Sequence, residues 1–212
     1  MLSARERRIF ALRKARSLAG ILPLGAFLVA HLFLMATAAM GRARFSAAIA
    51  WFDALPGLVV LEAVLIWLPL LFHGLSGLWL AAEGESNAAR FPRAANWLYF
   101  LQRLAGVVTL VFVAWHLYAT RIARALLEWD AEALWEAMAE KIGQGPYLAL
   151  YAAGAAAAVF HLTNGLRTAA RSWGLVSGRA GRRRAAIAAS LLGLGLVALA
   201  AAALAGFAGP GR

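Results

Sequence analysis

The sequence contains no cysteine and few charged residues. Without cysteine, the chain cannot form disulfide bonds, thiolate-ligated iron–sulfur clusters or a thiol nucleophile. Charged residues account for 15% of its 212 residues and hydrophobic residues for 63%, whereas soluble domains are usually about half apolar. Several apolar runs reach the roughly 20 residues that a helix needs to cross ~30 Å of hydrocarbon. These features predict a membrane protein without a sizeable soluble domain among these residues.

Five such runs predict the fold class, which is an all-α membrane protein built as a five-transmembrane-helix bundle. Residues 1–212 are expected to form a single membrane domain. A short amphipathic helix at the surface is predicted for about residues 129–142, because apolar residues recur there at helical spacing among acidic ones. The segment of about residues 41–56 is predicted to be a loop. The predicted spans cover about residues 18–40, 57–82, 97–120, 146–173 and 185–207.

The basic residues predict the orientation of the bundle. They outnumber the acidic residues by 21 to 10, and they flank the apolar runs. We therefore interpret the net charge of +11 as loop charge that sets membrane orientation, and we expect no nucleic-acid partner. Most basic residues fall on the side that holds the amino terminus, so the positive-inside rule predicts a cytoplasmic amino terminus. The acidic surface helix is then expected on the opposite side.

The chain has four histidines, and each lies in a different apolar span. Groups that can bind a metal are costly to place inside a membrane, so a function is their default interpretation. In the third span Gln102, Thr109 and His116 recur every seven residues and share one helix face. This polar face is expected to point into the bundle, which makes Gln102 a candidate cofactor-binding residue. The four histidines are His31, His73, His116 and His161.

The depth of each histidine in the membrane sorts the four into two pairs. At a rise of ~1.5 Å per residue, His31 and His116 fall on the outer side of the bilayer midplane. His73 and His161 fall on the cytoplasmic side by the same measure. Two imidazoles that face each other across a bundle can hold one flat macrocycle by both axial positions. We therefore predict two stacked b haems, an outer one bound by the first pair and an inner one bound by the second.

Other uses of the histidines remain open at this point. Zinc or a di-iron centre would need ligands that lie close together, often with carboxylates. A chain of histidines that moves protons across the membrane is another alternative. In a third, the protein is a cofactor-free transporter or scaffold whose histidines serve as polar packing groups. A reduced-minus-oxidised optical spectrum would separate haem binding from all of these.

Small residues and arginines add candidate cofactor contacts. Four glycines lie near the histidine face of their helices, where a missing side chain lets a macrocycle approach the backbone; close helix packing is the alternative. Three arginines on the predicted cytoplasmic side could pair with haem propionates, because a guanidinium binds a carboxylate with a planar fork. Alternatively, these arginines only follow the orientation rule. The glycines are Gly20, Gly77, Gly154 and Gly165, and the arginines are Arg103, Arg167 and Arg171.

Three motifs carry a resemblance to a known family. They read FHGLSGLWL from Phe72, QRLAGVVTLVFVAWH from Gln102 and FHLTNGLRTAARSWG from Phe160. With these motifs the chain resembles the di-haem cytochrome b anchor of succinate dehydrogenases and fumarate reductases, in the variant with a single five-helix membrane subunit. The resemblance covers the chain from about Arg16 to the end of the fifth span. The family pairs its histidine ligands between the first and third helices and between the second and fourth.

The resemblance also implies partners and an activity. A flavoprotein subunit with FAD and an iron–sulfur subunit are expected on the cytoplasmic face of a bacterial inner membrane, with the iron–sulfur subunit near Arg90–Arg93 and Arg167–Arg184. Electrons would pass from the clusters to the inner haem, the outer haem and a quinone, either menaquinone or ubiquinone. The chain would not be catalytic alone. A di-haem anchor of formate dehydrogenase or nitrate reductase type is the alternative.

Two positions bear on proton transfer. Some fumarate reductases of this family carry a glutamate two residues before the fourth-helix histidine, where this chain has Val159, so that proton route is not expected. Glu62 is the only carboxylate inside a predicted span, on the helix face of His73 and further outward. It is therefore a candidate group for quinone protonation. The alternative is a hydrated or hydrogen-bonded structural residue near the interface.

Overall fold

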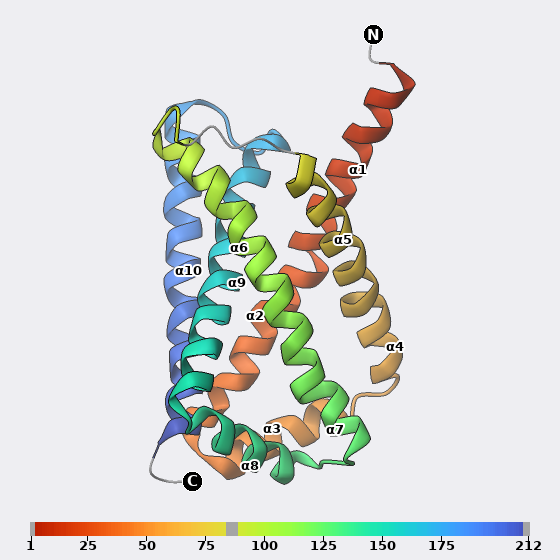
Figure 1. Cartoon of the computed structure of the whole chain (residues 1–212), viewed down its shortest axis with the longest axis vertical. Helices are drawn as coiled ribbons and strands as arrows, with labels where there is room; N and C mark the ends of the chain where they lie inside the picture. Colours follow the sequence, from red (N-terminus) through yellow and green to blue (C-terminus); the bar gives the residue numbers. More distant parts are fainter. Residues whose placement is uncertain (1–2, 84–88, 210–212) are drawn as a thin grey trace.

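The computed structural model describes residues 3–83 and 89–209, and every regular element within these ranges is helical. Five helical segments are long and apolar enough to cross a membrane, and they stand side by side as one bundle (Figure 1). This confirms the predicted five-helix membrane fold. The segments are Ala4–Met40, Leu58–Glu83, Ala94–Leu126, Gly145–Ser172 and Gly178–Ala208.

The first segment is two helices that meet at a proline. α1 (Ala4–Ile21) gives way to α2 (Pro23–Ala36), because Pro23 has no backbone N–H to continue the hydrogen-bond ladder. α1 begins well before residue 18, since Ser3 and Glu6 form a reciprocal capping box at its start. Its first turns project beyond the bundle at the upper end of Figure 1. The segment closes with a 3₁₀ turn, η1 (Thr37–Met40).

The second and third segments each contain a π-helical turn. Such turns insert an extra residue into the helix and are frequent at functional sites. Both lie toward the lower end of the bundle in Figure 1, where α4 and α7 are labelled. The second segment comprises α4 (Leu58–Glu62), the π-turn η2 (Ala63–Trp67) and α5 (Leu68–Glu83). The third comprises α6 (Ala94–Leu117), the π-turn η3 (Tyr118–Ile122) and α7 (Ala123–Leu126).

A pair of short helices closes the lower end. α3 (Arg42–Asp53) occupies most of the segment that the sequence predicts to be a loop, so that prediction is wrong. Its Phe45 and Ile49 are one helical turn apart and both buried, so they lie on one face of the helix. They pack into one apolar cluster with Trp135 of α8 (Ala131–Ile142), the predicted amphipathic helix. The apolar face of α8 is therefore covered by protein.

The last two segments pack closely against each other. They are α9 (Gly145–Ser172) and α10 (Gly178–Ala208), and α10 also packs against α2. Leu196 of α10 is 2% exposed within a cluster from these three helices. Gly206 lies so close to the backbone of Ala38 that a Cβ there would overlap it. α10 thus acts as a packing helix and leaves the space between the other segments to the site described next.

Candidate functional site

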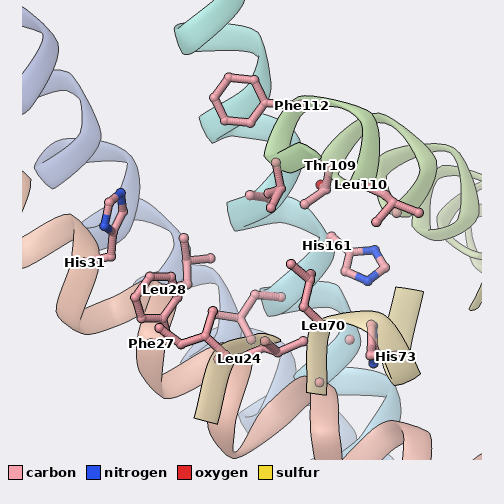
Figure 2. A pocket seen from close by; sticks show the side chains of 18 of the residues that line it. Leu24, Phe27, Leu28, His31, Leu70, His73, Thr109, Leu110, Phe112 and His161 are labelled. Atoms are coloured by element: carbon pink, nitrogen blue, oxygen red, sulfur yellow. The ribbon is translucent and has the colours of Figure 1, made fainter. Parts of the chain in front are cut away.

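A cavity of about 1320 Å³ lies between α1, α2, α5, α6 and α9. Its lining extends from Arg171 at the end where α1 begins to Asp53 at the opposite end. Pockets for one small molecule usually measure ~300–1,000 Å³, so this cavity can hold more than one such group. All four histidines of the chain line it. Figure 2 shows three of them, His31, His73 and His161, among the lining side chains.

The outer pair lies in an aromatic environment. The ring centroids of His31 on α2 and His116 on α6 are 5.9 Å apart, with the ring planes at 75°. Phe27 lies 5.4 Å from His31, and Phe112 stacks on His116 at 5.7 Å. Tyr151 meets His116 edge-on at 5.6 Å. The Nδ1 atom of His116 is buried, and it has no hydrogen-bond partner among the residues that the structure describes.

The inner pair is held by the backbone. The ring centroids of His73 on α5 and His161 on α9 are 6.0 Å apart, with the ring planes at 84°. Nδ1 of His73 lies 3.0 Å from the carbonyl oxygen of Arg16, and Nδ1 of His161 lies 3.0 Å from that of Gln102. An Nδ1–H that donates to a carbonyl fixes the tautomer and leaves Nε2 as the atom that can bind a metal.

A polar network supports His161. The side-chain amide of Gln102 donates to the carbonyl of His161 at 3.0 Å. Its oxygen accepts a 2.7 Å hydrogen bond from the amide of Asn164, and Arg167 donates to the oxygen of Asn164 at 2.7 Å. Asn164 is 7% exposed and also donates to the carbonyl of Leu98. The network fixes the relative rotation of α6 and α9 at the level of the inner pair.

Three of the four predicted glycines line the cavity, namely Gly20, Gly77 and Gly165. A Cβ at Gly20 would overlap the ring of His73, so α1 can approach that ring only because this residue is glycine. Gly154 does not line the cavity. A Cβ there would overlap the ring of Phe112, so Gly154 lets Phe112 lie beside His116 rather than opening space for a ligand.

The predicted arginines lie at the end where α1 begins. Arg103, Arg167 and Arg171 all line the cavity there. The guanidinium of Arg103 donates to the carbonyl of Ala81 and lies over the ring of Tyr99 at 5.5 Å. Arg167 donates to the side-chain oxygen of Asn164, as described above, whereas Arg171 is exposed.

Glu62 lies at the opposite end of the cavity. Its side chain is 13% exposed, and its carboxylate accepts hydrogen bonds from Arg121, with Nη2 at 2.8 Å and Nε at 3.1 Å. Arg121 belongs to the π-turn η3, and Glu62 immediately precedes the π-turn η2. A second ion pair, Arg124 with Asp53, lies beside this one on the cavity lining. The predicted carboxylate is thus present at the cavity, as one half of a forked ion pair.

Four further residues lie at the site without having been predicted from the sequence. Gly106 lies one helical turn after Gln102, and a Cβ there would come within 2.8 Å of His161 Cε1. Asn164 lies one turn after His161 and could have been found by extending the polar face of its helix. Nothing comparable in the sequence marks Arg16 or Arg121, because both look like ordinary basic residues that flank apolar spans.

The fold and the cavity define a helical membrane protein whose interior brings two pairs of histidines together. The family model described as succinate dehydrogenase/fumarate reductase transmembrane subunit matches residues 86–204. The chain is also 38% identical to the succinate dehydrogenase cytochrome b558 subunit of Bacillus subtilis (strain 168) over 168 residues, which are 79% of this chain and 82% of that protein. The chain therefore belongs to the family of succinate dehydrogenase and fumarate reductase transmembrane subunits.

This membership confirms the resemblance that the three motifs predict. It favours that family over an anchor of formate dehydrogenase or nitrate reductase type. Members of the family are membrane subunits of an enzyme complex, so the chain is not expected to be catalytic alone. Together with the five spans, the bacterial relative supports a multi-pass membrane protein of bacterial type.

Proposed function

We propose that the chain is the haem-binding anchor of a succinate:quinone oxidoreductase and passes electrons between an iron–sulfur subunit and membrane quinone. The observation that carries this proposal is the pairing of histidine rings, at 5.9 Å and 6.0 Å, within one cavity. The relative from Bacillus subtilis is called a cytochrome b558 subunit, which supports haem b as the bound group.

The residues present fit two b haems. A haem supplies four equatorial nitrogens of its own and needs two axial ligands from the protein, which is what each histidine pair offers. The close approach of α1 at Gly20 holds the His73 ring in place beside the cavity. Within residues 3–83 and 89–209, no three His, Asp or Glu side chains gather into the cluster that zinc or a di-iron centre would use.

In this proposal the protein holds two haems, orients their histidine ligands and keeps water away from them. When bound, haem supplies reversible one-electron transfer at its iron. His31 and His116 would hold the outer haem, and His73 and His161 the inner one. The backbone carbonyls of Arg16 and Gln102 would keep the inner imidazoles in the ligating tautomer. The aromatic and aliphatic lining would exclude water from both.

We place the arginine-rich end of the bundle on the cytoplasmic side, where the iron–sulfur subunit and the FAD-containing flavoprotein would dock. This end carries the basic first turns of α1 and the loop between α9 and α10. Arg90–Arg93 and Arg167–Arg184 would meet the iron–sulfur subunit and steer its approach. The positive-inside rule supports the same orientation.

The quinone, menaquinone or ubiquinone, would react at the end that holds Glu62. Reducing a quinone takes up two protons, and a carboxylate at the cavity can relay them. The forked contact with Arg121 holds the Glu62 carboxylate in one orientation there. Val159 is 3% exposed in the cluster with Leu32 and Leu196, so the position that some relatives use for a glutamate here serves packing.

Single histidine variants test the haem assignment. His73→Ala or His161→Ala should remove one low-spin b-type signal from the reduced-minus-oxidised spectrum, and His31→Ala or His116→Ala the other. Leu191→Ala, at a side chain that is 64% exposed on α10, is the control and should keep both signals. A histidine variant that retained both signals unchanged would contradict the assignment for that residue.

A further inference from the structure

We propose that Arg16 binds a propionate carboxylate of the inner haem, an inference that rests on the haem binding proposed above. It would make α1 an active part of the haem site rather than only a wall of the cavity. Arg16 was not among the arginines that the sequence suggests for this role. Three observations support it. Arg16 lies beside the inner pair, its side chain has no ion-pair partner among the described residues, and the nearby Arg103 and Arg167 are already hydrogen-bonded.

The position of Arg16 joins it to the inner pair twice. Its carbonyl oxygen lies 3.0 Å from Nδ1 of His73, so its main chain holds that ring. Its side chain lines the cavity and reaches α5, where Nη1 is 3.9 Å from the point at which Gly77 would carry a Cβ. Gly77 lies one helical turn after His73. The guanidinium therefore lies beside the inner pair on the side toward the arginine-rich end.

Among the described residues, the guanidinium of Arg16 has no ion-pair partner. Its Nε is buried without a hydrogen-bond partner in the described part of the chain, and no ion pair to Arg16 occurs there. Its charged neighbours on α1 are the basic Arg13 and Lys14. Arg16 is half-buried, and a partly buried charge without a partner among the described residues is costly, so an anion is expected to complete the site.

The chemistry of the anion follows from the cavity. Quinones carry no carboxylate, whereas each b haem carries two propionates, and a carboxylate matches the planar fork of a guanidinium. The nearby Arg103 and Arg167 already donate to the carbonyl of Ala81 and the amide oxygen of Asn164. Arg16 is thus better placed than either to bind a propionate.

Redox titration of the assembled complex in membranes tests the inference. Arg16→Leu removes a positive charge beside the inner haem, and a positive charge favours the reduced form, which carries one electron more. The midpoint potential of the b signal that His73→Ala abolishes should fall, and the other potential should stay unchanged. The titration is made at a pH well above the ordinary range of carboxyl groups, so that a propionate stays ionised.

The matched control is Arg8→Leu, which removes the same charge from an exposed position of α1 outside the cavity. It should leave both potentials unchanged. If Arg16→Leu does not accumulate in membranes, Arg16→Gln, which keeps a polar side chain without charge, is measured in the same way. Unchanged potentials in these variants, or a shift confined to the outer haem, would overturn the inference. An unaltered protein without b haem would instead overturn the proposed function.

Discussion

At the scale of single residues, the two histidine pairs differ in what holds their rings. Both inner rings have Nδ1 facing a backbone carbonyl at 3.0 Å, and Gln102 adds a side-chain hydrogen bond to the backbone of His161. The outer His116 instead lies among Phe112 and Tyr151, with no hydrogen-bond partner for Nδ1 in the described part of the chain. Hydrogen bonds to ligating imidazoles fix orientation and raise basicity. The inner pair should therefore be the more sensitive to changes behind the rings.

Gly106 offers a direct test of that sensitivity. A Cβ at this position would lie 2.8 Å from Cε1 of His161, closer than van der Waals contact allows. Gly106→Ala should displace the ring and weaken inner-haem binding by roughly 10–100-fold, the range seen when the outer support of a metal ligand is lost. Haem content per polypeptide measures the effect. Gly195→Ala is the control, since a Cβ there meets nothing within 4 Å. Equal haem contents in the two variants would contradict this prediction.

Glu62 carries the prediction for quinone chemistry. Glu62→Gln keeps the shape of the side chain but removes its ability to take and give a proton. Quinone-linked turnover should fall at least about tenfold, the scale of a lost acid–base group. Haem content and turnover with an artificial dye should be unchanged, because neither needs this proton. Glu140→Gln, on the exposed face of α8, is the control. Full quinone turnover in Glu62→Gln would return Glu62 to a structural role in the ion pair with Arg121.

At the scale of elements, α3 is where the structure differs from the prediction, because the sequence predicts a loop there and the structure has a helix. It buries only a few residues, and they are covered only when α8 packs against them, so residues 41–56 taken alone favour a loop. Arg42 bridges the two helices by binding Glu132 and Glu136, with 2.8 Å to the latter. α1 was also longer than expected, although the Ser3–Glu6 capping box is a signal that the sequence contains. The spans were predictable because apolar length is a local property.

The contact between α3 and α8 predicts a pH dependence. The Ser46 hydroxyl and the Arg42 guanidinium lower the pKa of Glu132 below its ordinary value of 4.5. A carboxyl group whose pKa is lowered by folding stabilises the folded state above its ordinary pKa, and this contribution is lost as pH falls through the lowered value. Glu132→Gln should therefore lower the unfolding temperature of the purified protein at neutral pH. The difference from the unaltered protein should vanish in acid, and a constant difference at all pH values would contradict the prediction.

At the scale of the whole molecule, part of the site was readable from the sequence and part was not. The fixed rise of a helix allowed histidine depths to be estimated, and the structure brings the rings of the predicted partners within about 6 Å of each other. Contacts such as Arg16 with Gly77 and Arg121 with Glu62 depend on helix rotation, on the break at Pro23 and on the two π-turns. The proline marks its break in the sequence, but helix rotation and the π-turns have no local sequence signal, so these contacts required the packed bundle.

The orientation of the whole molecule is the last expectation that can be measured. Its two ends differ in charge, because the basic first turns of α1 and the basic start of α10 share one end, whereas the acidic α8 lies at the other. Basic flanks stay in the cytoplasm, so the end with α1 should face inward. The absence of cysteine allows single labels without background: Glu140→Cys should react with a membrane-impermeant maleimide in intact spheroplasts, and Ala4→Cys only after permeabilisation. The unaltered protein should stay unlabelled, and the reverse pattern would place both the docking face and the quinone end on the wrong sides of the membrane.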